Sequence, residues 1–200
     1  MKGSLIIVGF FLLGVLLSRW EILPEPFVEN DFSMYALYVL MFLVGISIGC
    51  DRKAFEALKT QNLKIILVPL ATIMGTLLGS ALVSLLLSGR SLSDCLAVGA
   101  GFGYYSLSSI FITEYKGAEL GTIALVANIL REIITLLGAA FLARYFGKLA
   151  PICSGGATTM DTTLPVITRF SGKEFVIIAI FHGFIVDFSV PFLVTFFARL

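Results

Sequence analysis

Long runs of apolar residues alternate with short polar stretches along this chain. A transmembrane helix needs about 20 predominantly apolar residues, and most of the runs approach or exceed that length. The pattern therefore predicts an all-α, polytopic membrane protein that forms a single transmembrane domain over residues 1–200. The predicted membrane-embedded segments cover residues 3–18, 32–49, 63–87, 92–113, 120–146, 151–167 and 175–198.

Two of the predicted segments are interrupted by glycine, at GAGFG in residues 99–103 and at SGGAT in residues 154–158. Paired broken helices are typical of the substrate sites of transporters. Glycines of this kind also allow helices to pack closely, which is the simpler interpretation. The segment 151–167 is polar for a membrane segment, so it either crosses the bilayer or enters it and returns on the same side.

Composition narrows the possible functions. Hydrophobic residues make up 58% of the chain and charged residues only 14%, whereas soluble domains are about one quarter charged. A soluble domain and a disordered chain are therefore excluded, and the net charge of +1 gives no indication of a nucleic-acid partner. The cysteines are far apart and no metal, cofactor or enzyme motif is present, so we expect neither a cofactor nor an enzyme.

Loop charges predict the orientation. The loop between Arg52 and Lys64 is basic, whereas the loop between Glu21 and Asp31 is acidic. Because basic loops stay in the cytoplasm, the N-terminus should be cytoplasmic. Seven crossings would then place the C-terminus outside, whereas a re-entrant 151–167 would place it inside.

Ionisable side chains at membrane depth are costly, by about 2.5–3.5 kcal/mol on insertion scales, and so indicate function. Arg131 and Glu132 lie inside one predicted span. Glu132 shares a helix face with Asn128, four residues earlier, which places an amide and a carboxylate together. The alternative is that Arg131 and Glu132 each form a salt bridge to another helix.

The last two segments contain further carboxylates. Asp161 lies among hydroxyl-bearing and small residues, a setting that suits an ammonium group, a cation or a proton; alternatively, it is solvated in an outer loop. Asp187 lies four residues before Pro191, whose missing N–H leaves the Asp187 carbonyl without its helical partner. A lone histidine in an apolar helix, His182, is more often structural.

Three stretches resemble the bacterial lysine exporter family in both order and spacing. They are GAGFGYYSLSSI (99–110), ELGTIALVANILREI (119–133) and SGGATTMDTTLPVITR (154–169). The resemblance implies an inner-membrane protein that exports L-lysine and its toxic analogues, in exchange for protons. It also implies that two intramembrane acids carry the function, and by motif these are Glu132 in LREI and Asp161 in TTMDTTLP.

The resemblance extends the predicted site and its partners. Glu132 and Asp161 would receive the ammonium groups of lysine, with Asn128, Arg131 and Asp187 nearby. The backbone and hydroxyls of Ser154, Thr158 and Thr159 would hold its carboxylate. Alternatively, the chain carries another small solute, or is a non-transporting subunit.

The family's length raises a question about partners. Its full-length members are about half as long again, so this chain matches their C-terminal two-thirds. The missing N-terminal part would amount to roughly three spans. We therefore expect a small membrane protein that supplies those spans, a homodimer, or a divergent minimal form. The remaining expected partners are lysine, protons and the lipid bilayer.

Overall fold

The computed structural model describes residues 63–200 and a few isolated helical positions before them. Those positions are Leu13, Leu16, Leu17, Arg19, Tyr35, Val39, Phe42 and Ile46. The chain divides into two compact units, Met1–Ile46 and Ser47–Leu200. The predicted segments 3–18 and 32–49, and the two loops that predict the orientation, therefore lie outside the continuously described residues.

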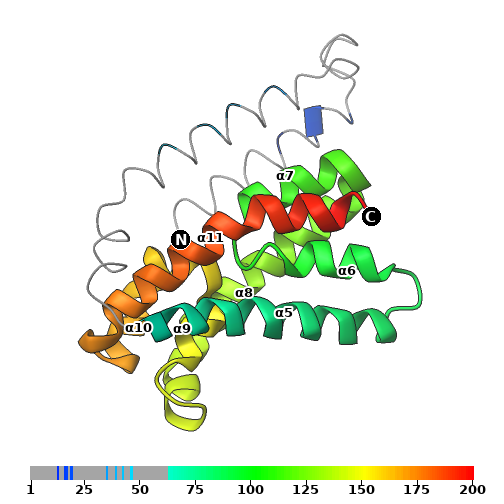
Figure 1. Ribbon diagram of the computed structural model, residues 1–200. Helices are drawn as coiled ribbons and strands as arrows, with labels where there is room; N and C mark the ends of the chain where they lie inside the picture. Colours follow the sequence, from blue (N-terminus) through cyan, green and yellow to red (C-terminus); the bar gives the residue numbers. More distant parts are fainter. Residues whose placement is uncertain are drawn as a thin grey trace. The chain divides into compact units, whose positions relative to one another are not determined.

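Three long helices dominate the described part of the chain (Figure 1). They are α5 (Leu67–Leu86), which follows the short η1 (Leu63–Ile66), α8 (Ala118–Tyr145) and α11 (Val176–Ala198). Each is long and apolar enough to cross a membrane, α11 together with the turn before it. Every element from residue 63 onward is helical, so the all-α prediction is confirmed there.

Two hairpins of short helices lie between the long ones. The first hairpin contains α6 (Leu92–Gly99) and α7 (Tyr105–Lys116). The second contains α9 (Ala150–Gly155), η2 (Gly156–Met160) and α10 (Leu164–Ser171), and is followed by η3 (Lys173–Phe175). The longest of these helices, α7, has 12 residues. It therefore extends about 18 Å, well short of the roughly 30 Å of hydrocarbon in a bilayer.

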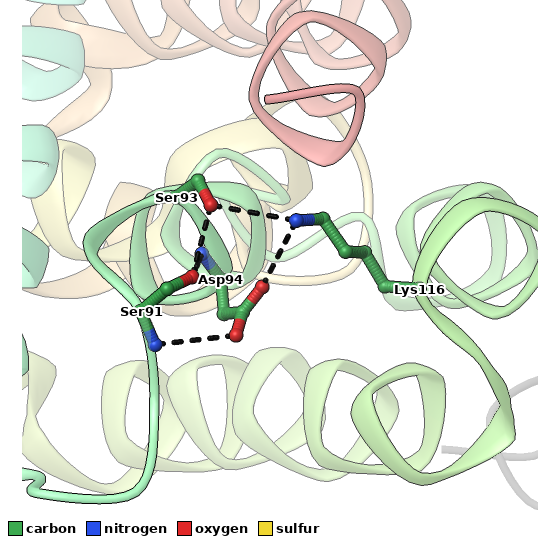
Figure 2. Close-up of polar contacts among 4 residues, drawn as sticks. All are labelled: Ser91, Ser93, Asp94 and Lys116. Carbon is green, nitrogen blue, oxygen red and sulfur yellow. Dashed lines mark hydrogen bonds and ion pairs between the residues drawn. The ribbon is translucent and has the colours of Figure 1, made fainter.

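The two outer ends of the first hairpin are in contact (Figure 2). Lys116 Nζ, at the end of α7, lies 3.3 Å from Asp94 Oδ1 and 3.4 Å from Ser93 Oγ, at the start of α6. Ser91 and Asp94 also form a capping box that begins α6. The predicted segment 92–113 is thus two antiparallel helices that return to their starting level, rather than one continuous helix.

The second hairpin has the same design at the other end of α8. Lys148 Nζ, just before α9, donates a hydrogen bond of 2.7 Å to the Phe170 carbonyl near the end of α10. Residues 150–171 therefore also return to the level at which they began. The C-terminal end of α11 reaches the first hairpin again, where Arg199 donates to the Tyr115 hydroxyl at 2.9 Å (Figure 1).

A small apolar core closes the outer end of the second hairpin. Ile152 of α9, Ile167 of α10 and Ala179 of α11 are fully buried against one another. Val68, at the start of α5, packs against this core. In a membrane such contacts stabilise by close packing rather than by removal from water. The core therefore fixes the second hairpin against two long helices.

Candidate functional site

The two hairpin tips, residues 99–104 and 153–163, meet through their main chains. Ala157 N donates a hydrogen bond of 2.9 Å to the Phe102 carbonyl. A Cβ on Gly156 would lie 2.0 Å from that same carbonyl oxygen, and Gly156 has φ +62°. Only glycine fits this approach and this backbone conformation. The two glycine-interrupted segments therefore contact each other directly.

The first tip holds a strained, buried aromatic residue. Phe102 has φ 44°, a left-handed conformation that bulky residues rarely adopt. Its side chain is fully buried, and the Arg131 guanidinium lies 5.9 Å from its ring centroid. Backbone strain of this kind persists only where the surrounding structure enforces it, and it is common at functional sites.

One turn of α8 binds both tips. The Asn128 Oδ1 accepts a hydrogen bond of 2.7 Å from Gly103 N in the first tip. Arg131 donates from Nε to the Ser154 carbonyl at 2.9 Å and from Nη2 to the Cys153 carbonyl at 3.0 Å. Its Nη1 donates to Thr76 Oγ1 at 3.3 Å. Within residues 63–200, Arg131 thus has carbonyl and hydroxyl partners rather than the acid expected for an interhelical salt bridge.

Glu132 lies in the same region, on the α8 face that contacts both hairpins. Its neighbours on that face are Asn128, bound to the first tip, and Thr135, whose hydroxyl lies 2.7 Å from Ser154 Oγ. Glu132 is only 4% exposed. Within residues 63–200 its carboxylate has no hydrogen bond or ion pair, so the described part offers no salt-bridge partner. An unpaired carboxylate at this depth indicates a functional site.

Two further carboxylates belong to the second tip and to α11. Asp161 follows η2, and its carboxylate accepts a hydrogen bond from Thr162 N. Asp187 of α11 is buried, and α11 also bonds to the second tip, where Thr159 Oγ1 donates to the Ala179 carbonyl at 2.9 Å. Asp161 therefore lies at the second tip with an exposed side chain, and its assignment to the site stays a prediction.

The threonines of the second tip bond within the protein. Thr158 Oγ1 donates to the Gly155 carbonyl at 2.8 Å, and Thr159 Oγ1 lies 2.8 Å from the Gly156 carbonyl. These bonds satisfy the main chain where the helix is broken. Both hydroxyls therefore support the tip, as does Ser154 through its contact with Thr135. That they also receive a substrate carboxylate stays a prediction.

His182 has a larger role than a lone histidine in an apolar run indicates. It is fully buried, with Nε2 2.8 Å from Thr72 Oγ1 and Nδ1 3.1 Å from Thr159 Oγ1. Thr72 Oγ1 also donates to the Val68 carbonyl at 3.1 Å, so this hydroxyl joins the His182 ring to the main chain of α5. His182 thus links α5, α11 and the second tip.

The crossing of two broken hairpins between long apolar helices is the architecture of a membrane transport protein. Residues 8–198 match the family described as lysine exporter LysO. The chain belongs to this family of transporters and is not an enzyme, as its three motifs predict.

Two curated relatives have different lengths. The lysine exporter LysO of Escherichia coli K12 is 35% identical over 170 residues, which cover 84% of this chain and 56% of that protein. The putative lysine exporter of Haemophilus influenzae is 31% identical over 195 residues, which cover 98% of this chain and 95% of that protein. The chain thus spans about half the length of the first relative. No solved structure matches it significantly.

Proposed function

We propose that this protein exports L-lysine across the bacterial inner membrane, and that Glu132 alternately binds a proton and a substrate ammonium group. The observation that carries the proposal is the position of Glu132. It is a buried carboxylate without a partner among residues 63–200, on the α8 face that contacts both hairpin tips. Membership of the lysine exporter family supports the choice of substrate.

The charges near the crossing suit this substrate. Lysine has two ammonium groups and one carboxylate at neutral pH. Glu132 provides one anionic site, and the carboxylates of Asp161 at the second tip and Asp187 on α11 provide a second. Among residues 63–200, Arg131 is the only arginine or lysine that contacts the two tips, and its guanidinium donates to main-chain carbonyl groups. An organic anion would find fewer matching charges there, so a cationic amino acid is favoured over that alternative.

Coupling to protons follows from the membrane potential. Moving one net positive charge outward against an inside-negative potential costs about 2.3 kcal/mol per 100 mV. Exchange for one inward proton cancels the net charge, and the pH gradient can then drive export. A carboxylate that releases a proton on one side and accepts an ammonium group there would perform this exchange.

The described helices also support a topology. We propose that α5, α8 and α11 span the membrane, while the two hairpins enter it from opposite sides and return. The outer end of the second hairpin carries Arg144, Lys148, Arg169 and Lys173 with a single acid, Glu174. At the outer end of the first hairpin, Arg90 and Lys116 are paired with Glu119 and Asp94. The positive-inside rule therefore places the second hairpin's end in the cytoplasm and the C-terminus outside.

Cysteine labelling tests this topology. Ser88 and Lys173 are exposed residues at opposite ends of the long helices. In a variant whose native cysteines are replaced, Ser88→Cys should react with a membrane-impermeant thiol reagent in intact cells. Lys173→Cys should react only after permeabilisation. The reverse pattern would overturn the orientation.

Lysine efflux tests the function. Cells loaded with lysine should release it faster when they express this chain, and Glu132→Gln should remove the increase at equal expression. Release of a different solute, with no effect on lysine, would favour the alternative carrier. No release of any solute by the chain alone, with restoration by a co-purifying protein, would favour a subunit of a split transporter.

The expected partner remains a proposal as well. Because relatives of two lengths exist, the assembly must be measured on this chain. We propose that it functions with a second copy or with a small membrane protein. Particle mass in mild detergent, combined with lysine exchange in liposomes, tests this. An active monomer would contradict it.

A further inference from the structure

We infer that Asn128 and Arg131 are positioning residues that hold the two hairpin tips together around Glu132, and that neither binds the substrate. They lie three residues apart on α8, so they share one flank of the helix. Asn128 binds the first tip and Arg131 binds the second. One helical turn therefore fixes both tips, in addition to the single main-chain bond between them.

Most of the hydrogen-bonding capacity of the Asn128 amide is used within the protein. Its Oδ1 accepts from Gly103 N at 2.7 Å, a main-chain donor that the break after α6 leaves without a helical partner. Its Nδ2 lies 2.9 Å from the Ala124 carbonyl and 3.4 Å from Ser108 Oγ. Residue 128 thus supplies the acceptor that the first tip needs, and little capacity remains for a ligand.

Arg131 holds the second tip by donating hydrogen bonds to its main-chain carbonyls. Its Nε and Nη2 atoms donate to consecutive carbonyls, those of Ser154 and Cys153, where α9 ends. The last carbonyls of a helix lack helical partners and attract cations. A planar guanidinium can reach two such carbonyls at once, whereas a lysine ammonium cannot reproduce that fork. The charge of Arg131 is therefore used within the protein.

This arrangement has a consequence for the transport cycle, and this part rests on the proposed function. Glu132 follows Arg131 directly, so its position depends on the same turn of α8. Loss of either positioning residue should loosen one tip and slow the step in which the tips move. It should leave the affinity for the substrate largely unchanged, because the anionic groups remain.

Hydrogen–deuterium exchange of the purified full-length protein tests the positioning role without transport. Asn128→Ala should speed exchange by about tenfold in peptides that contain Gly103, and Arg131→Gln should do the same in peptides that contain Ala157. Thr122→Val is the matched control on α8, because the Thr122 hydroxyl donates to its own helix, at the Ala118 carbonyl, and to no other group in the described part of the chain. Unchanged exchange at both tips in the two test variants would overturn the inference.

A conservative variant distinguishes the loss of specific hydrogen bonds from general misfolding. Arg131→Lys retains the charge but not the fork, so exchange at the second tip should lie between the wild-type value and that of Arg131→Gln. Full protection in Arg131→Lys would show that charge alone is sufficient, and would overturn the role assigned to the fork.

Transport of two substrates in liposomes distinguishes positioning from substrate binding. Lysine has a carboxylate, whereas cadaverine has the same chain and ammonium groups without one. For lysine, and for cadaverine if it is transported, Arg131→Lys should lower the maximal rate by about tenfold. The KM should change less than about twofold. A raised KM for lysine alone would show that Arg131 binds the carboxylate, and would overturn the inference. If the wild type transports neither compound while the exchange pattern holds, the proposed function fails and the positioning role stands.

Discussion

The two hairpins are alike in plan and different in chemistry. From Cys95 to Thr113 the first hairpin has no acidic or basic side chain, and its tip consists of small and aromatic residues. The second carries Asp161 and several hydroxyls at its tip. Both are bound by α8, but through an amide in the first case and a guanidinium in the second. The comparison indicates that the first hairpin supplies shape, whereas the second supplies charge.

The largest expected effect comes from the carboxylates. Glu132→Gln and Asp161→Asn should each reduce lysine efflux from loaded cells to background, because both changes keep size and polarity but remove the charge that attracts ammonium. Glu119→Gln is the matched control, since Glu119 is an exposed acid paired with Arg90 at an outer end. Wild-type efflux in Glu132→Gln or Asp161→Asn at equal expression would assign that residue a structural role.

The next effect tests the contact between the hairpins. Gly156→Ala should abolish efflux and lower the melting temperature by several degrees, because its Cβ would lie 2.0 Å from the Phe102 carbonyl oxygen. Backbone conflicts of this kind cost about 1–3 kcal/mol. Gly138→Ala, on α8, meets no described atom within 4 Å and should be neutral. Normal efflux by Gly156→Ala would mean that the tips need not touch.

A smaller effect is expected at His182, which forms a hydrogen bond with the second hairpin but none with the first. His182→Gln should slow efflux severalfold and cost about 1–3 kcal/mol, because buried partners on α5 and the second tip lose their hydrogen bonds. Thr72→Val removes one of these bonds and should cost less. The loss of unfolding free energy in the double variant should not exceed the sum of the losses in the two single variants. Thermal unfolding in detergent measures this; an unchanged melting temperature in His182→Gln would exclude the link.

The smallest effect concerns the outer end of the first hairpin. Partial burial would raise the pKa of Asp94, but hydrogen bonds from Ser91 and the nearby Lys116 ammonium hold it below the ordinary value of 3.8. The stabilisation is therefore present at neutral pH, and is lost as the pH falls below about 4 through the lowered pKa. Asp94→Asn should change stability by at most about 1 kcal/mol at pH 7. It should also flatten the decline in melting temperature below pH 4; an equally steep decline would contradict this assignment.

The sequence predicts the breaks and the key acids because each depends on local chemistry. Glycines in an apolar run indicate a break, and a carboxylate at membrane depth indicates a function. The return of the first hairpin was not predicted, because hydropathy cannot distinguish one spanning helix from two half-length helices of equal apolar content. The contact between Asp94 and Lys116 that reveals the return joins residues far apart in the chain.

The partners of Arg131 were hidden for a different reason. They are main-chain carbonyls of Cys153 and Ser154, and every residue has such a carbonyl, so no side-chain pattern indicates which ones are used. The pairing of Asn128 with Glu132 on one face of α8 was predicted from their spacing. What the sequence could not show is that this face would meet both tips.

The bond between Ala157 N and the Phe102 carbonyl has a consequence for how the protein tolerates variation. Because main-chain atoms make this contact, side chains at positions 102 and 157 could change while the bond persists. A saturation mutagenesis library selected for lysine resistance should therefore show narrow tolerance at Gly156, where a Cβ would lie 2.0 Å from the Phe102 carbonyl oxygen, and at Gly103, whose φ of +94° disfavours any side chain. At Ala157, which is buried, small residues should be accepted, but proline should not, because it alone lacks the N–H that donates between the hairpins.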